Sequence, residues 1–395
     1  MSSLLSKSNL LRSISTPIRF ANLELKKSIF GRLNETGSTF KLFNLDLHIS
    51  VTRDLQIGFE NQGVEIVNWS ISRHNEIFRN FFVGPDPVRV IHNKSWRLID
   101  ENMIEKFLSI YGRYLNQFDG FVVTHTPVFH EIYQGLGKPI LVINSTRYEA
   151  PYSSLPEKWD SLNNSLHQSW SNSRAMIVSN NQSDSKYLEY FTGIKSDVVP
   201  SICDYTGAHW SGGSGLKVFS DKRMSPQMKK VISRISGWLP LSDVVKGKFS
   251  WNFMETIEGI FVIPYNISTM QFFEFATAGI PVIVPSKAFL GELFCEMAAL
   301  QELSYFQIEA LPTSGLHEMD PNNYESERFL EFWLEKADFY DNHLMPNVHS
   351  VNSFEELRDF KIAADRLSYY KKLGERNSEF KDLRDETLKS FVGML

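Results

Sequence analysis

Short apolar runs alternate with longer amphipathic stretches from about residue 40 onward. This alternation is typical of βα units that build a mostly parallel sheet. It predicts helices at 51–62, where Gly63 ends the helix, and at 183–191, where Ser183 is the expected cap. The predicted strands are residues 41–45, 64–71, 88–92, 120–125, 138–144, 174–180 and 196–201. We therefore expect residues 40–203 to form a first α/β domain.

A glycine-rich stretch at residues 204–215 interrupts the alternation and has the composition of a linker. Its glycines are Gly207, Gly212, Gly213 and Gly215. The alternation then restarts and predicts a second α/β domain over residues 216–345. The elements expected there are strands at 216–220, 259–264 and 280–285 and helices at 226–236 and 269–278.

The two ends of the chain have a different pattern. Residues 346–395 have helical periodicity, and Ser353 and Glu356 have the spacing of a capping box, so we expect a helical tail. Residues 1–39 are polar and weakly patterned. We treat them as an N-terminal arm, and the sequence assigns them no role.

Composition and charge narrow the class of protein. The 395 residues are 42% hydrophobic and 22% charged, as in a globular protein, and the net charge of −5 gives no reason to expect nucleic-acid binding. Cys203 and Cys295 are too few for a disulfide framework or a zinc cluster, which favours a reducing cytoplasm. No run has the length and apolar character of a signal peptide or a membrane span.

The stretch from residue 259 to 286, GIFVIPYNISTMQFFEFATAGIPVIVPS, carries the most chemistry. An apolar strand leads into a turn with the hydroxyls of Ser268 and Thr269, and a helix follows. Ser268 and Gln271 have capping-box spacing, and the free backbone N–H groups at the start of such a helix suit a diphosphate. Glu274, about one and a half turns in, is placed to bind the two hydroxyls of a ribose. The alternative for Glu274 is a solvated helix residue.

This stretch resembles the donor-binding segment of GT-B glycosyltransferases. The shared pattern is strand, polar turn, helix with a glutamate, and then A-x-A-G-I-P-V-I-V-P. The resemblance covers these 28 residues most specifically and residues 40–345 more loosely. It implies two Rossmann-like domains facing each other across a cleft, with the nucleotide diphosphate at the helix start and the ribose at Glu274. Many retaining members carry an acidic residue eight positions earlier, where this chain has Asn266, so a standard retaining mechanism is not expected.

Cations for the donor phosphates are expected after the first strand of the second domain. In the resembled family, basic residues there often contact the phosphates, and Lys222 and Arg223 hold that place. Arg223 ranks first because its guanidinium binds phosphate in a bidentate manner. The alternatives are Lys229, Lys230 and Lys248, or no phosphate role for any of these cations.

Two further features concern the donor site. Tyr265 is placed to pack against the base or the ribose of the donor, or to lie in the core. The chain has no Asp-x-Asp triplet, so we expect no obligatory metal and no cofactor, with the nucleotide sugar as donor substrate.

Candidates for the base that deprotonates the acceptor follow strands of the first domain. Asp46 and His48 come after the first predicted strand, and His125 and His130 follow a later one. The alternatives are that Asp46 caps a helix and that His48 bonds the backbone. Arg147, Tyr148 and Glu149 are candidates for acceptor contacts.

We therefore expect a metal-independent glycosyltransferase that moves a sugar from a nucleotide-diphosphate donor to a glycan or lipid-linked acceptor. The sequence leaves inversion and retention both open, and inversion would need a base from the first domain. Peripheral membrane attachment stays open for the case of a lipid-linked acceptor. A nucleotide-sugar epimerase of the same fold and a non-catalytic glycan- or protein-binding module are the alternatives.

Overall fold

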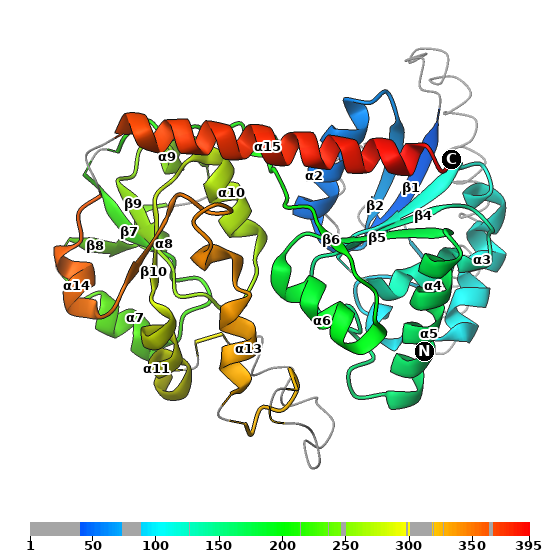
Figure 1. Cartoon of the computed structure of the whole chain (residues 1–395), viewed down its shortest axis with the longest axis horizontal. Coiled ribbons are helices and arrows are strands. Elements are labelled where there is room, and N and C mark those ends of the chain that lie inside the picture. The colour runs from blue at the N-terminus through cyan, green and yellow to red at the C-terminus, as the bar shows by residue number, and fades with distance from the viewer. Residues whose placement is uncertain are drawn as a thin grey trace, which may run out of the picture.

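The computed structural model describes most of the chain from residue 40 to the C-terminus. The described residues are 40–72, 88–125, 127–213, 215–235, 237–245, 250–297, 299–300, 318, 320–326, 328–362 and 366–395. The predicted arm at 1–39 and Lys248 lie outside them. Two α/β lobes lie side by side, and each has a sheet at its centre (Figure 1).

The first lobe contains a six-stranded parallel sheet in the order β2-β1-β3-β4-β5-β6. Its strands are β1 (Lys41–Asp46), β2 (Glu65–Ser70), β3 (Gly120–Val123), β4 (Ile140–Asn144), β5 (Ala175–Ser179) and β6 (Asp197–Val198). Its helices are α2 (Ile49–Glu60), η2 (Trp96–Leu98), α3 (Glu101–Leu115), η3 (Pro127–Phe129), α4 (His130–Gln134), α5 (Pro156–Ser171) and α6 (Gln182–Thr192).

The second lobe contains a five-stranded parallel sheet in the order β11-β10-β9-β7-β8. Its strands are β7 (Lys217–Phe219), β8 (Trp238–Pro240), β9 (Gly259–Phe261), β10 (Val282–Pro285) and β11 (Val348–Val351). Its helices are α7 (Pro226–Ile232), α8 (Leu241–Val244), α9 (Trp251–Met254), α10 (Met270–Ala278), α11 (Lys287–Met297), α13 (Phe329–Glu335), η5 (Asp338–Tyr340) and α14 (Phe354–Asp359). A short helix, η4 (Asp204–Thr206), lies between the lobes in sequence. Two parallel sheets flanked by helices confirm the predicted fold class.

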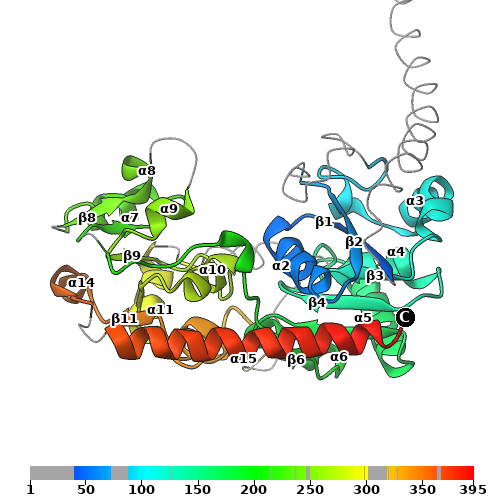
Figure 2. The same cartoon turned by 90° about the horizontal axis from the view of Figure 1, so that it is seen from above.

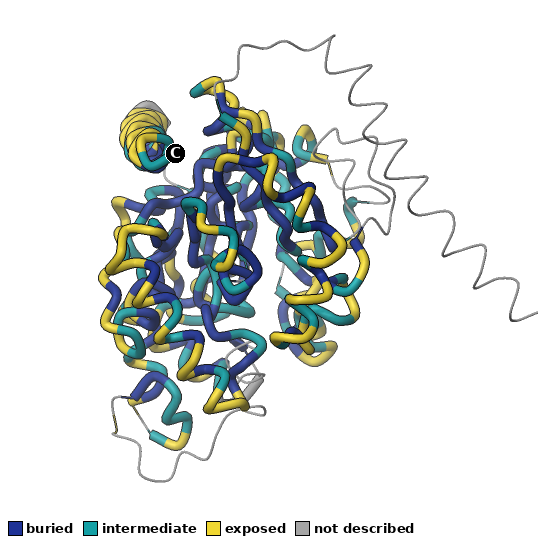
Figure 3. Tube along the Cα trace, turned by 90° about the vertical axis from the view of Figure 1, so that its right-hand side faces the viewer, coloured by how far each residue is buried: buried dark blue, intermediate teal, exposed yellow. Residues whose placement is uncertain are grey.

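Both sheets are buried between layers of helices whose outer faces are exposed (Figure 3). The central strands are mostly apolar and buried on both faces, as is usual for parallel strands between two helical layers. Strand β3 is buried along its whole length, and so are β4 and β10. The apolar runs that predicted these strands therefore reflect burial on both sides of the sheet.

Local signals set the ends of the helices. Helix α6 begins at Asn181, whose side chain accepts a hydrogen bond from the Asp184 N–H at 2.8 Å. Asn181 and not the predicted Ser183 is the cap; the hydroxyl of Ser183 bonds the Lys336 carbonyl in the second lobe. Helix α10 ends at Gly279, which adopts the left-handed conformation at φ 70° that glycine tolerates best.

The predicted strand at residues 88–92 is wrong. Val90 has φ 73°, and the Ile91 N–H bonds the Arg89 carbonyl at 2.9 Å, which is a γ-turn. The Ser95 hydroxyl also bonds the Val90 carbonyl. These local bonds occupy the backbone groups that a strand would offer to a neighbour.

The helical tail differs from its prediction at its start. Residues Val348–Val351 form strand β11, which pairs with β10 and extends the second sheet. Ser353 then caps α14 as predicted, accepting a bond from the Glu356 N–H at 3.1 Å. The carboxylate of Glu356 reaches the Asn352 N–H and not that of Ser353.

The last helix, α15 (Arg366–Val392), runs across both lobes (Figures 1 and 2). Near its start, the Tyr369 hydroxyl bonds the Gly279 carbonyl at the end of α10. Near its end, Phe391 packs edge-on against Phe59 of α2 in the first lobe. A Cβ atom on Gly58 would lie 2.6 Å from Leu388, so α2 and α15 pack at close range. Helix α15 therefore joins the two lobes.

Within the described ranges, no helix combines the length and apolarity that a bilayer crossing requires.

Candidate functional site

A pocket of about 370 Å³ opens in the second lobe at the carboxyl ends of β7 and β9. The chain leaves β7 toward β8 on one side and later returns to β9 on the other, so these neighbouring strands flank the topological switch point of the sheet. Open parallel sheets bind ligands at such points. The lining side chains come from residues Ser220, Lys222, Arg223, Met224, Ser225, Met228, Leu241, Val262, Ile263, Pro264, Tyr265, Gln271, Glu274, Ala299 and Leu300.

The cationic side of the pocket is the loop after β7. Lys222 and Arg223 are both exposed there and both line the pocket. Lys229 instead pairs with the buried Asp221 at 3.1 Å, and Lys230 does not line the pocket. Among the candidate phosphate-binding cations in the described residues, Lys222 and Arg223 are therefore the two that line the pocket.

Tyr265 lines the same pocket and packs against a cation. The guanidinium carbon of Arg223 lies 3.8 Å from the centre of its ring. Such a stack holds a planar guanidinium in a defined orientation. In this structure one face of the Tyr265 ring therefore contacts Arg223. The predicted packing of Tyr265 on a base or ribose stays a prediction.

Glu274 lies on the face of α10 that lines the pocket, so it is not a solvated helix residue. Its Oε1 accepts hydrogen bonds from the Tyr205 hydroxyl at 2.5 Å and from the Ser50 hydroxyl at 3.5 Å. Burial raises the pKa of Glu274 to about 7, and both hydrogen bonds oppose that rise. The carboxyl group therefore titrates near neutrality at a point where both lobes meet.

The turn before α10 corrects one expectation. The cap of α10 is Thr269, its side chain makes no capping bond, and the predicted box between Ser268 and Gln271 is wrong. The helix begins one residue later than such a box requires. Neither Ser268 nor Thr269 is among the described residues that line the pocket, and Thr269 is 9% exposed. Their predicted contact with a diphosphate stays a prediction.

In the first lobe, Asp46 lies at the carboxyl end of β1, beside the switch point between β1 and β3. Its Oδ1 accepts from the Leu47 and His48 N–H groups at 2.5 and 3.3 Å. Its Oδ2 accepts from the Thr124 N–H, the Thr124 hydroxyl and the His125 N–H at 2.9, 2.5 and 2.8 Å. Burial raises the pKa of Asp46 against these bonds. Both carboxylate oxygens of Asp46 thus accept hydrogen bonds from the protein. Asp46 thereby connects the loop after β1, which carries His48, to the loop after β3, which carries His125.

The rings of His48 and His125 lie 5.0 Å apart. Burial lowers the pKa of His48 to about 3 and that of His125 to about 4, so both imidazoles are neutral near pH 7. After burial, His125 lowers the pKa of His48 further, Asp46 opposes this, and Arg223 of the second lobe adds a smaller lowering. The Nδ1 of His48 is buried and has no hydrogen-bond partner in the described part of the chain. A neutral imidazole has the lone pair that a general base requires, and the lowered pKa makes His48 a weaker base than a solvated histidine.

The other candidates of the first lobe lie in packed interiors. His130 is fully buried and its Nε2 bonds the Ser169 hydroxyl at 2.9 Å, so it is not accessible to an acceptor as a candidate base would have to be. The buried pair of Arg147 and Glu149 is joined at 2.8 Å, and Tyr148 is also fully buried.

Arg147 also connects the lobes. It bonds the Asn322 side chain at 2.6 Å and packs over Tyr187, whose ring stacks on Trp333 of α13 with 5.4 Å between centroids. Of the three residues predicted to contact an acceptor, Arg147 makes a contact between the lobes, and Tyr148 and Glu149 lie beside it. Trp333 of the second lobe therefore packs against the first lobe.

Tyr205 and Ser50 were missed as site residues. Tyr205 lies in the predicted linker, and Ser50 lies in the first turn of α2. No spacing in the sequence connects either residue to Glu274, which is 69 positions from Tyr205 and 224 from Ser50. Only the arrangement of the lobes brings them together. In the described ranges, no three His, Cys, Asp or Glu side chains are grouped so that they could hold a metal ion.

Comparison with known proteins gives similarity at the level of structure. No family model matches the chain, and no curated protein matches its sequence. The glycotransferase of kitacinnamycin is similar over 89% of this chain and 97% of its own, at a TM-score of 0.44 and 8% identity. The rhamnosyltransferase SpnG, solved with thymidine diphosphate, is similar over 89% and 99% at a TM-score of 0.35 and 9% identity. The forosaminyltransferase SpnP is similar over 76% and 96%, at 0.34 and 12%. These values are too low to assign an activity to this chain.

Proposed function

We propose that the chain is a glycosyltransferase that moves a sugar from a nucleotide-diphosphate donor to the hydroxyl of a glycan or lipid-linked acceptor. One observation carries this proposal. The pocket at the second switch point combines two exposed cations with a carboxylate, and a pair of neutral histidines occupies the first switch point.

The donor binds in the pocket of the second lobe. Lys222 and Arg223 neutralise the diphosphate and stabilise the negative charge that develops on it as it leaves. Glu274 accepts hydrogen bonds from the ribose hydroxyls, and Ser268 and Thr269 lie on the turn nearest the start of α10. Because two cations compensate the phosphate charge, the proposed reaction needs no metal.

The acceptor approaches from the first lobe. His48 takes the proton of the acceptor hydroxyl while that oxygen forms a bond to the anomeric carbon, and the bond from this carbon to the diphosphate breaks. The nucleoside diphosphate leaves with the electron pair, and one such displacement inverts the anomeric centre. His125 lies beside His48, and Asp46 positions both loops through its hydrogen bonds.

The two alternative functions, an epimerase and a non-catalytic binding module, make predictions that differ from those of a transferase. An epimerase would need paired carboxylates in the pocket, and Glu274 is the one acidic side chain among the described lining residues. A binding module would hold the donor or a glycan without turnover.

Cys203 is a free buried thiol, which fits a reducing compartment, so we also propose a cytoplasmic location.

Calorimetry with UDP, GDP, CDP, ADP and TDP tests the proposal. We expect at least one of them to bind the wild-type protein and Arg223→Met to weaken it about 10- to 100-fold, the usual effect of losing a charge-assisted hydrogen bond. Lys230→Met is the matched control, because it removes an exposed charge that does not line the pocket. If no nucleotide binds, or if both variants weaken binding equally, the proposed donor site is wrong.

A further inference from the structure

Glu274 is the point at which three separate parts of the chain meet. It belongs to α10 of the second lobe, Tyr205 belongs to η4 between the lobes, and Ser50 belongs to α2 of the first lobe. The bond from the Tyr205 hydroxyl is 2.5 Å long, and the Ser50 hydroxyl lies at 3.5 Å, the limit for a hydrogen bond. Tyr205 is therefore the main partner of the carboxylate.

The segment that carries Tyr205 is itself held in place. Both oxygens of the buried Asp54 accept backbone bonds from it, from the Ile202 N–H at 3.1 Å and the Cys203 N–H at 2.8 Å. Arg384 of α15 then bridges Asp54 and Asp204 at 3.4 and 3.9 Å. The backbone on which Tyr205 stands is thus tied to α2 and to α15.

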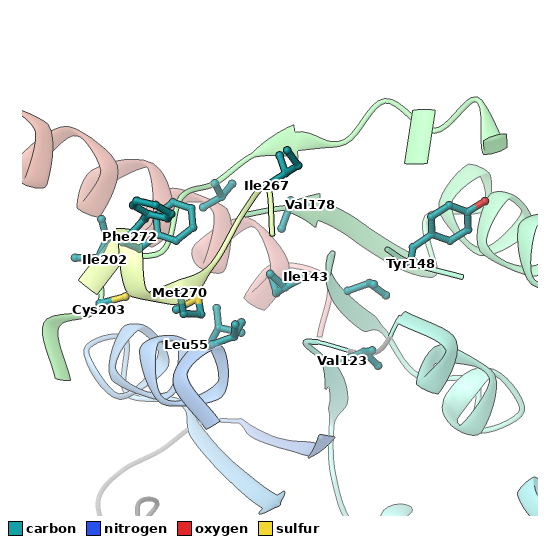
Figure 4. Close-up of a cluster of buried hydrophobic side chains, with 14 of the residues drawn as sticks. Leu55, Val123, Ile143, Tyr148, Val178, Ile202, Cys203, Ile267, Met270 and Phe272 are labelled. Carbon is teal, nitrogen blue, oxygen red and sulfur yellow. The ribbon is translucent and has the colours of Figure 1, made fainter. Parts of the chain in front are cut away.

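Apolar packing surrounds the same junction. Figure 4 draws Leu55 of α2, Met270 of α10 and the neighbouring Ile202 and Cys203 within one buried cluster. The Thr277 hydroxyl of α10 also bonds the Ile202 carbonyl. The segment that carries Tyr205 is therefore bonded both to α2 of the first lobe and to α10 of the second.

We propose that Tyr205 is a positioning residue: its hydroxyl holds Oε1 of Glu274 so that the rest of the carboxylate faces the pocket, and this couples ribose binding to the junction of the lobes. The proposal rests on the donor site described above. Tyr205 is not among the pocket-lining residues, so it acts through Glu274 and not through contact with the ligand.

The electrostatics of the junction support this role. Burial raises the pKa of Tyr205 far above its usual value, so the phenol stays neutral and donates its proton. Its bond favours the ionised form of Glu274, whose pKa burial has raised to about 7. The buried Cys203 thiol lies close enough for the charge of Glu274 to raise its pKa, and Lys222 and Arg223 line the same pocket as Glu274. Without the Tyr205 hydroxyl, the pKa of Glu274 must rise further, and less carboxylate is available to a ribose.

Tyr205→Phe removes the hydroxyl and keeps the ring. Tyr369→Phe is the matched control, because its hydroxyl bonds α10 at Gly279 and not at Glu274. The first readout is the pKa of Glu274, followed by carbon NMR of glutamate-labelled protein. We expect it to move upward in Tyr205→Phe and to stay at the wild-type value in Tyr369→Phe.

The second readout is calorimetry at pH 7.5 with the best-binding ribonucleoside diphosphate and its 2′-deoxy form. We expect Tyr205→Phe to weaken the ribonucleotide about tenfold and the deoxynucleotide much less. Ser50→Ala should have a smaller effect of the same sign, because its bond is longer. If Tyr205→Phe behaves like Tyr369→Phe in both readouts while nucleotides still bind, the positioning role is overturned. If no nucleotide binds the wild-type protein, the proposed function fails, and the pKa readout still shows whether Tyr205 controls Glu274.

Discussion

Arg384 of α15 lies 3.4 Å from Asp54 of α2, and the two side chains are 2% and 3% exposed. Because the start of α15 bonds the end of α10 in the second lobe, this buried pair attaches the other half of the same helix to the first lobe. Asp54 in turn accepts the backbone bonds of the segment that leads to Tyr205. The ion pair therefore stabilises the arrangement of the lobes on which the candidate site depends.

Removing the Arg384 side chain should be strongly destabilising. Arg384→Met leaves the Asp54 charge buried without its cation, and breaking such a pair costs about 3–5 kcal/mol. The measurement is calorimetric unfolding at pH 7.5, where we expect a clear drop in Tm. Arg358→Met is the control, because that arginine pairs with Asp359 on the surface, and we expect no measurable change. Equal effects of both variants would contradict a structural role for the buried pair.

Glu274→Gln should stabilise the protein while it impairs donor binding. The folded-state pKa of Glu274 is raised to about 7 from a usual 4.5, so the folded state holds a proton there that the unfolded state has lost. Its contribution to stability is present below pH 4.5 and is lost as the pH rises through 7, up to about 3 kcal/mol in order of magnitude. We expect the Tm gain of Glu274→Gln over wild type to be larger at pH 8 than at pH 4.5. A gain that is the same at both pH values would mean that the carboxyl group titrates normally.

His48→Gln should reduce sugar transfer about 10²- to 10⁴-fold, the usual contribution of a general base. Donor affinity should stay at the wild-type value, because His48 does not line the donor pocket. The measurement is release of nucleoside diphosphate from the donor in the presence of glycan or lipid-linked acceptors. His167→Gln, an exposed histidine of α5, is the control. Full activity of His48→Gln would remove this residue as the base.

The pH dependence should separate kcat from KM. Burial lowers the pKa of His48 to about 3, so its basic form is complete above about pH 5 and kcat should be constant from pH 8 to 5. Glu274 titrates near 7, so KM for the donor should rise as the pH falls below 7. Initial rates over this range measure both. A decrease of kcat at acid pH with a midpoint near 6.5 would instead indicate that the general base is a solvated histidine.

Much of the fold could be predicted because burial of parallel strands leaves a direct trace in the sequence. The apolar runs that became β3, β4 and β10 are buried on both faces. The failure at residues 88–92 has a physical cause, since apolar composition cannot reveal the γ-turn at Val90. A three-residue strand such as β8 is also too short to show a pattern.

Some site residues could be predicted because polar residues that follow parallel strands gather at the carboxyl edge of the sheet. Residues that reach the site through long-range contacts could not be predicted. Lys222, Arg223 and Glu274 follow strands or lie on the helix after a strand, and the structure brings them to one pocket. The same reasoning also selected His130, which is buried and bonds Ser169 in the interior. Tyr205 gave no signal, because its partner is 69 residues away and the linker composition around it indicates only flexibility.

A crystal structure with the nucleoside diphosphate that binds most tightly tests the central claim most directly. We predict the diphosphate beside the loop after β7, with its oxygens within 3.2 Å of Arg223 or Lys222, and the ribose hydroxyls on the carboxylate of Glu274. A nucleotide bound outside this pocket, or bound in it without contact to Glu274 and to either cation, would contradict the account.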